Sequence, residues 1–222
     1  MLPPTIDVPI GSLLTALSLV GAFVFAASGA LAAARLQQTL VTFAFFALIT
    51  GVGGGTMRDL LIGAPVFWIH DARPALICLT AALLVYLTPE RWWSARALDW
   101  LDAIGLAAFA VFGTAKAMSL GIHPFVAVLM GVISACVGGI IRDLLAGVPS
   151  ILLRREIYVT AGALAAALYA LLIYFAVPAP VASVIAALAG FALRALAIVR
   201  GLGLPVYNRR KASTDQAGGP SE

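Results

Sequence analysis

Charged side chains are scarce in this chain: Asp, Glu, Lys and Arg make up 11% of its 222 residues, against about 25% in an ordinary soluble domain. A soluble domain of this length needs a polar shell around its core, so the scarcity excludes a water-soluble protein. Hydrophobic residues make up 62% and the mean hydropathy is +1.04. We therefore expect an integral membrane protein without a second, extramembrane domain.

Cysteine and histidine are also scarce, with two residues of each. Cys78 and Cys136 lie in apolar stretches without metal-type neighbours, and we interpret both as small buried side chains. The chain has no His-x-x-x-His motif and no Ser/His/Asp or Cys/His set at one depth. The net charge of +4 forms no basic face. We expect no enzymatic activity, no metal, no cofactor and no nucleic-acid partner.

Uninterrupted apolar runs predict seven membrane-spanning helices, and hence an all-α membrane fold. The predicted spans are residues 10–33, 39–63, 74–89, 100–120, 124–147, 156–176 and 180–200. Residues 1–9 form a short segment before the first span, and residues 201–222 are polar enough to predict a disordered tail.

The basic residues outside the spans sort to one side of the membrane. With seven spans, nine of them fall on the side of the C-terminus, and Arg73 falls on the other. Short cytoplasmic loops retain Lys and Arg, so this bias predicts a cytoplasmic C-terminus and an N-terminus outside the cell. The nine residues are Arg35, Arg91, Arg96, Arg154, Arg155, Arg200, Arg209, Arg210 and Lys211.

A twelve-residue pattern, GG-x-x-RDLL-x-G-x-P, occurs twice. It spans residues 54–65 and 138–149, an offset of 84 positions. Each copy of the repeat covers three predicted spans, and because three is odd, the second copy enters the membrane from the opposite side. The sequence thus predicts two inverted repeats, residues 10–89 and 100–176, joined by a cytoplasmic loop at 90–99 and followed by a seventh helix at 180–200.

Glycines fall near the middle of the second and fifth spans. We expect them to interrupt these two helices and to line a pathway between the repeats, since inverted-repeat proteins commonly place their binding site between broken helices. Close helix packing through small residues is the alternative. The glycines concerned are Gly51, Gly53, Gly54 and Gly55 in the second span, and Gly138 and Gly139 in the fifth.

An Arg-Asp pair follows each glycine group, inside the predicted spans. Charges in the hydrocarbon are costly and are normally paired. Adjacent helical residues point about 100° apart, so we expect pairing across the repeats, Arg58 with Asp143 and Arg142 with Asp59. Two alternatives are pairing onto the helix ends exposed at the breaks and a role limited to holding the two halves together.

Further polar residues lie in or near the central spans. Lys116 either extends to water at the outer end of the fourth span or lies beside the pathway as a displaceable cation. Asp99 and Asp102 lie at the start of that span and are expected to cap it. Thr50, Thr56 and Ser134 are candidate ion-binding groups.

The twin motifs, the three-plus-three-plus-one arrangement of spans and the basic tail resemble the TRIC family, the trimeric intracellular cation channels, in their prokaryotic form. The resemblance covers residues 10–200. It implies a homotrimer in the plasma membrane, in contact with lipid, in which each protomer has its own pore for K⁺ and other monovalent cations. It also implies that the second and fifth helices bound the constriction, at Gly53 to Gly55 and at Gly138 and Gly139. We expect gating where the fifth helix bends, at Gly138 and Gly139.

Two other functions remain open at this point. Inverted repeats with broken helices also occur in secondary carriers, so a transporter of a small solute such as glycine is the main alternative. The small-residue faces also suit a structural protein that acts through oligomerisation.

Overall fold

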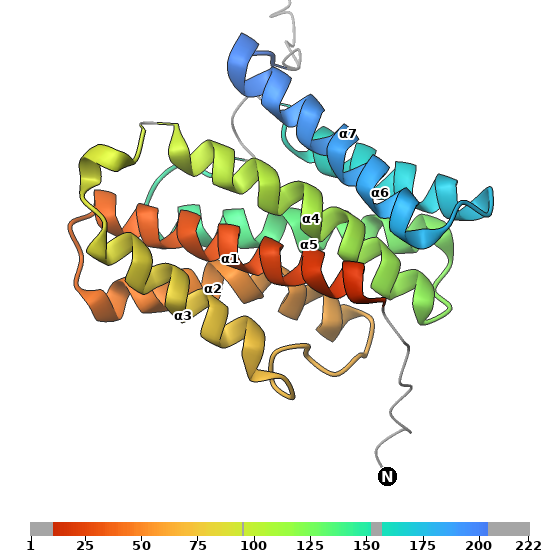
Figure 1. Cartoon of the computed structure of the whole chain (residues 1–222), viewed down its shortest axis with the longest axis horizontal. Helices are drawn as coiled ribbons and strands as arrows, with labels where there is room; N and C mark the ends of the chain where they lie inside the picture. The colour runs from red at the N-terminus through yellow and green to blue at the C-terminus, as the bar shows by residue number, and fades with distance from the viewer. Residues whose placement is uncertain (1–10, 95, 152–156, 204–222) are drawn as a thin grey trace, which may run out of the picture.

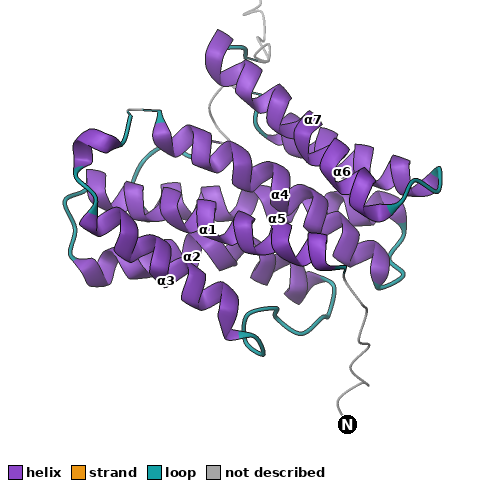
Figure 2. Cartoon of the chain, in the orientation of Figure 1, coloured by secondary structure: helices purple, strands orange, loops and turns teal. Residues whose placement is uncertain are grey.

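The structure, a computed structural model, describes residues 11–94, 96–151 and 157–203, and these form seven α-helices and one 3-10 turn (Figures 1 and 2). The predicted segment 1–9 and most of the predicted tail lie outside the described residues. The elements are α1 (Ser12–Arg35), α2 (Leu40–Leu61), α3 (Ala72–Leu87), η1 (Glu90–Trp92), α4 (Ala97–Ser119), α5 (Pro124–Leu145), α6 (Val159–Tyr174) and α7 (Ala179–Arg200).

Five of these helices, α1, α2, α4, α5 and α7, are long and apolar enough to cross a membrane. The predicted spans match them to within a few residues. The other two, α3 and α6, are apolar but have 16 residues each. At 1.5 Å per residue they are about 24 Å long, shorter than the roughly 30 Å hydrocarbon core. Helix length therefore supports five full spans, and the spans at α3 and α6 stay predictions.

The helices form a central group of four with flanking helices on either side. Helices α1, α2, α4 and α5 pack against one another, α3 packs on α1 and α2, and the α6–α7 pair packs on α4 and α5 (Figure 1). Under the 84-residue offset, α1, α2 and α3 correspond to α4, α5 and α6. The central group is thus made of two corresponding helices from each repeat.

Corresponding residues make reciprocal contacts across the centre. A Cβ on Gly21 would lie 2.9 Å from the ring of Phe109, and a Cβ on Gly105 would lie 2.9 Å from the ring of Phe25. Each of these four positions matches its counterpart at an offset of 84. The two phenylalanine rings meet with centroids 5.5 Å apart. Reciprocal contacts of this kind are those of a self-complementary, two-fold interface.

Helices α2 and α5 end in the same way. Gly63 and Gly147 both have a φ of +66°, a left-handed conformation that glycine adopts without steric cost. Beyond them, the backbone N–H of Ala64 donates to the carbonyl of Asp59 (2.9 Å), and that of Val148 donates to Asp143 (3.1 Å). The repeated G-x-P letters after each Arg-Asp pair therefore encode a helix stop.

The predicted interruption of the second and fifth helices is wrong. Both α2 and α5 are helical throughout, including the glycines. A Cβ on Gly54 would overlap the carbonyl oxygen of Ser134, and a Cβ on Gly138 would lie 2.7 Å from the carbonyl oxygen of Thr50. These two glycines allow the backbones of α2 and α5 to touch, so the alternative, close packing through small residues, is confirmed.

Candidate functional site

The first charge cluster lies at the C-terminal end of α2. The Arg58 guanidinium donates through Nε to Asp59 Oδ1 (2.9 Å) and through Nη1 to Ser134 Oγ on α5 (3.2 Å). The Lys116 ammonium of α4 binds the same Asp59 oxygen at 2.8 Å. The other oxygen accepts the backbone N–H of Phe67 (2.9 Å). Arg58 and Asp59 are fully buried, so the Asp59 carboxylate has no contact with solvent and pairs with two cations, Arg58 and Lys116.

The second cluster lies at the C-terminal end of α5. Arg142 donates through Nε (2.9 Å) and Nη2 (2.8 Å) to Asp143 Oδ1. Its Nη1 reaches Asp102 of α4 at 2.6 Å and Ser28 of α1 at 3.1 Å. The backbone N–H of Ile151 donates to Asp143 Oδ2 (2.6 Å). One guanidinium therefore binds two buried carboxylates and links α5 to α1 and α4.

The two clusters share a common frame but differ in charge. Phe67 and Ile151, which donate to the aspartates, are separated by the same 84 positions as the motifs. The extra group from α4 has no such counterpart: it is Lys116 in the first cluster and Asp102 in the second. The first cluster thus combines two cations with one anion, and the second combines one cation with two anions.

The predicted pairing across the repeats is wrong. In the described part of the chain, each arginine instead pairs with the aspartate beside it in sequence. The 100° separation applies to the Cα–Cβ directions, but an arginine side chain is long enough to curve around the helix to its neighbour. The clusters still join the repeats, through the hydrogen bond from Arg58 to Ser134 and that from Arg142 to Ser28.

The structure also decides the roles of two α4 residues. Asp102 is fully buried and paired with Arg142, so the prediction that it caps the helix is wrong, whereas Asp99 does lie in the first turn of α4. The Lys116 side chain is 13% exposed and ion-paired, so its ammonium does not extend freely to water.

The predicted pathway residues separate into two groups. Gly54, Gly138 and Ser134 meet at the α2–α5 contact, next to the first cluster. Gly53 also faces α5, but it meets only the end of the Ile141 side chain. The others face elsewhere: Gly55 faces the ring of Phe67, Gly139 faces Tyr158 and Asp102, and Thr56 bonds Val52 and Trp68.

Sequence reasoning did not identify Ser28, Tyr158 and Arg194. All three are buried; Ser28 accepts from Arg142, and the Arg194 guanidinium of α7 lies 5.3 Å above the Tyr158 ring. The conspicuous signal was Arg194, a lone charge inside an apolar span, which normally indicates a buried partner.

Comparison with known proteins supports this architecture. The sequence pattern of the family described as "Glycine transporter" matches twice, at residues 15–90 and 99–174, again 84 positions apart. The inner membrane protein YadS of Escherichia coli is 37% identical over 195 residues, which cover 86% of this chain and 94% of YadS. A Vibrio cholerae membrane protein is 44% identical over 68% of this chain, but the match spans only 64% of that relative.

Among solved structures, a TRIC trimeric intracellular cation channel orthologue from Rhodobacter sphaeroides superposes with a TM-score of 0.80 at 40% identity, covering 86% of this chain and all of that one. The chain belongs to the prokaryotic TRIC family. A second TRIC cation channel structure is 30% identical with a TM-score of 0.78. A TRIC channel from C. elegans, 14% identical with a TM-score of 0.58, shares the fold.

The relatives and the apolar helices together place this protein in a membrane. The curated relatives are named membrane proteins, and five helices of this chain are long and apolar enough to span a bilayer. The protein is therefore a multi-pass membrane protein. The solved relatives are named as channels rather than as enzymes.

Proposed function

We propose that this protein is a passive channel for monovalent cations, with K⁺ as the permeant ion, and that it works as a homotrimer with one pore in each protomer. The observation that carries the proposal is the match to the Rhodobacter sphaeroides TRIC channel orthologue, at 40% identity over its whole length. The pore would run between two inverted repeats, a relation supported by the reciprocal contacts at the centre of the fold.

The α2–α5 contact is the proposed gate. The helices touch at Gly54 and Gly138, where the backbone leaves no room for even a methyl group, so a pore between them would be closed in this conformation. Ion passage would require α2 and α5 to separate. Of the two glycines expected to act in gating, Gly138 faces α2, whereas Gly139 faces the second cluster.

The charge clusters would influence ions near this gate. Asp59, Asp102 and Asp143 offer carboxylates to a cation, but each is engaged by Arg or Lys. A permeating ion would therefore compete with Lys116 or Arg142 for these oxygens, which keeps its binding weak enough to permit release.

We further propose a plasma-membrane location with the N-terminus outside and the C-terminus in the cytoplasm, from the distribution of Lys and Arg. Ser94 and Ser119 are exposed and lie on opposite sides in this topology. In intact cells, an impermeant thiol reagent should label S119C but not S94C. The reverse pattern would show the opposite orientation.

Recording in planar bilayers tests the channel proposal. Purified protein should give unitary K⁺ currents that reverse at the K⁺ equilibrium potential, and mass measurement of the same sample should give three chains per particle. Absence of currents together with saturable glycine counterflow would overturn the proposal in favour of a secondary transporter, the alternative suggested by the description of the matching family. Absence of both would favour a structural role.

A further inference from the structure

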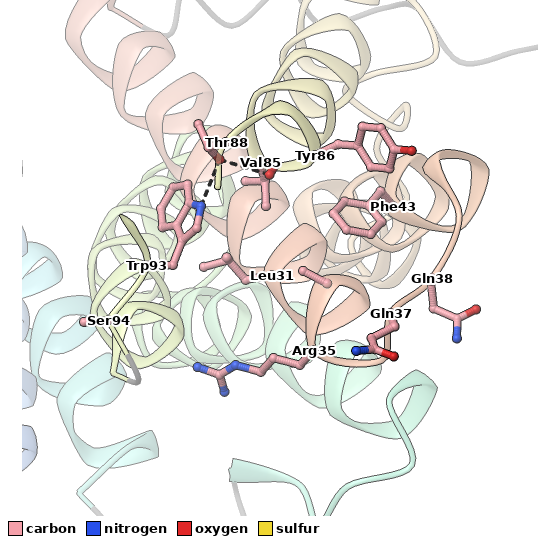
Figure 3. Close-up of a pocket in the computed structure, with 11 residues that line it drawn as sticks. Leu31, Arg35, Gln37, Gln38, Phe43, Val85, Tyr86, Thr88, Trp93 and Ser94 are labelled. Atoms are coloured by element: carbon pink, nitrogen blue, oxygen red, sulfur yellow. Dashed lines mark hydrogen bonds between the residues drawn. The ribbon is translucent and has the colours of Figure 1, made fainter. Parts of the chain in front are cut away.

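A cavity of about 300 Å³, lined by none of the residues of the charge clusters, lies where α1 ends, α2 begins and α3 ends. Its walls differ in character (Figure 3). The aromatic rings of Phe43, Tyr86 and Trp93 lie along one side, and the polar side chains of Arg35 and Gln37 lie along the other. A cavity with an apolar wall and a cationic, amide-bearing wall suits an amphiphilic ligand rather than an ion or an apolar molecule.

The aromatic wall is fixed in position. Trp93 donates its indole N–H to the Thr88 hydroxyl (2.9 Å), which donates to the carbonyl of Val85 (3.0 Å). Phe43 and Tyr86 meet edge to face with centroids 5.2 Å apart. Because Trp and Tyr favour the headgroup level of a bilayer, these rings indicate that the cavity opens at the membrane surface.

Gln37 occupies a backbone position that suits glycine. Its φ is +52°, and the turn that it forms after α1 is repeated after α4, where Gly121 stands at the corresponding position with a φ of +75°. The backbone hydrogen bonds of the two turns match, from Gln37 to Ala34 (2.9 Å) and from Gly121 to Met118 (3.0 Å). The fold therefore requires a left-handed residue there, but it does not require glutamine.

Strain alone does not mark a site, since Ala176 also has a positive φ (+58°). Gln37 differs because its amide lies at the cavity, and because the second repeat lacks the whole set of cavity groups. The counterparts of the polar and aromatic residues are small or apolar. At an offset of 84, Arg35, Gln37, Phe43, Tyr86 and Trp93 correspond to Ser119, Gly121, Ala127, Ala170 and Val177.

We propose that this cavity binds the phosphodiester headgroup of a glycerophospholipid, through the Arg35 guanidinium and the Gln37 amide. Arginine is suited to phosphate because its planar fork donates two parallel hydrogen bonds. The volume accommodates the phosphate and glycerol but not the acyl chains. These chains would run along exposed apolar side chains next to the cavity, Val41 on α2 and Leu87 on α3.

The proposal is independent of conduction, because the cavity shares no residue with the α2–α5 contact and its test measures binding only. Native mass spectrometry of the delipidated full-length protein in detergent, titrated with dioleoylphosphatidylglycerol, reports the lipid bound per chain. Dioleoylglycerol, which has the same chains without the phosphate, and inorganic phosphate are titrated separately. The variants are Q37G, R35Q and R91Q, the last removing an exposed charge from the same side outside the cavity.

We expect phosphatidylglycerol binding to weaken about fivefold in both Q37G and R35Q, equivalent to about 1 kcal/mol, and to be unchanged in R91Q. Q37G should keep its melting temperature, since glycine suits this turn. Wild-type affinity in both cavity variants would overturn the proposal, and so would an equal loss in R91Q. Equally tight binding of dioleoylglycerol would show an acyl-chain site, and equally tight binding of phosphate would show a site for the free ion; either result would also overturn it.

Discussion

The contact between α2 and α5 makes a quantitative prediction for G54A. A methyl group at this position would overlap the carbonyl oxygen of Ser134 and lie 3.1 Å from its carbonyl carbon. Both are backbone atoms in a helix, so no side-chain rotation relieves the clash. Overpacking of this kind costs about 1–3 kcal/mol, and we expect the upper part of that range.

Alanine also favours the helix by up to about 1 kcal/mol over glycine. This gain is the same in the open and closed states if α2 stays helical in both, so it does not change their ratio. If α2 and α5 separate on opening, only the closed state carries the clash, at about 2–3 kcal/mol. The ratio of open to closed channels should therefore rise about 30- to 160-fold.

G53A is the matched control. Gly53 directly precedes Gly54 on α2. A methyl group on Gly53 would meet only the terminal Cδ1 of Ile141, at 3.1 Å, which is the flexible end of a side chain. G53A carries the same gain in helix propensity without the backbone clash. Single-channel open probability at fixed voltage should rise in G54A and in G138A but not in G53A. Equal open probability in G54A and G53A would refute the assignment of this contact as the gate.

Three further predictions concern stability, activity and accessibility. D59N should lower the free energy of unfolding by about 3–5 kcal/mol, and with it the melting temperature in detergent, because Arg58 and Lys116 would lose the carboxylate that they share. D71N should leave the melting temperature unchanged, because its pair with Arg73 is exposed and asparagine can still cap α3; an equal loss in both would contradict the argument. The double charge swap R58D with D143R should not restore activity lost in the singles, because each arginine pairs with its own neighbour; rescue would show contact across the repeats. Cys78 and Cys136 should react with maleimide only after unfolding, since both are free and buried, and rapid labelling of the native protein would contradict that burial.

The Asp71–Arg73 pair at the start of α3 shows how solvent exposure changes the role of an ion pair. Asp71 lies at the N-terminal end of this helix, and its hydrogen bonds from the Arg73 side chain and backbone lower the pKa of its carboxyl. The pair is exposed, unlike the clusters at Arg58 and Arg142. The same two residue types therefore form a solvated surface pair at one place and a buried structural one at another.

Much of the helical layout was predictable because it depends on local composition. Apolar runs of about 20 residues give membrane helices whatever they pack against, and the ends of α2 and α5 follow from Gly63 and Gly147. The glycine groups were ambiguous, since glycine suits both a helix break and a close helix contact. That choice depends on the facing helix, which for Gly54 is α5, 80 residues further along the chain.

The sequence by itself determined that this is a helical membrane protein built from two copies of a three-helix unit, because hydropathy and a repeated twelve-residue pattern are properties of neighbouring residues. Only the tertiary structure decided which charges meet. It placed Lys116 in the first cluster and Asp102 in the second, gave them opposite charge excess, and paired each arginine with the aspartate beside it. Ion pairs form between groups that packing brings within about 3 Å, and a long side chain can reach several partners from one position, so linear spacing could not select among them.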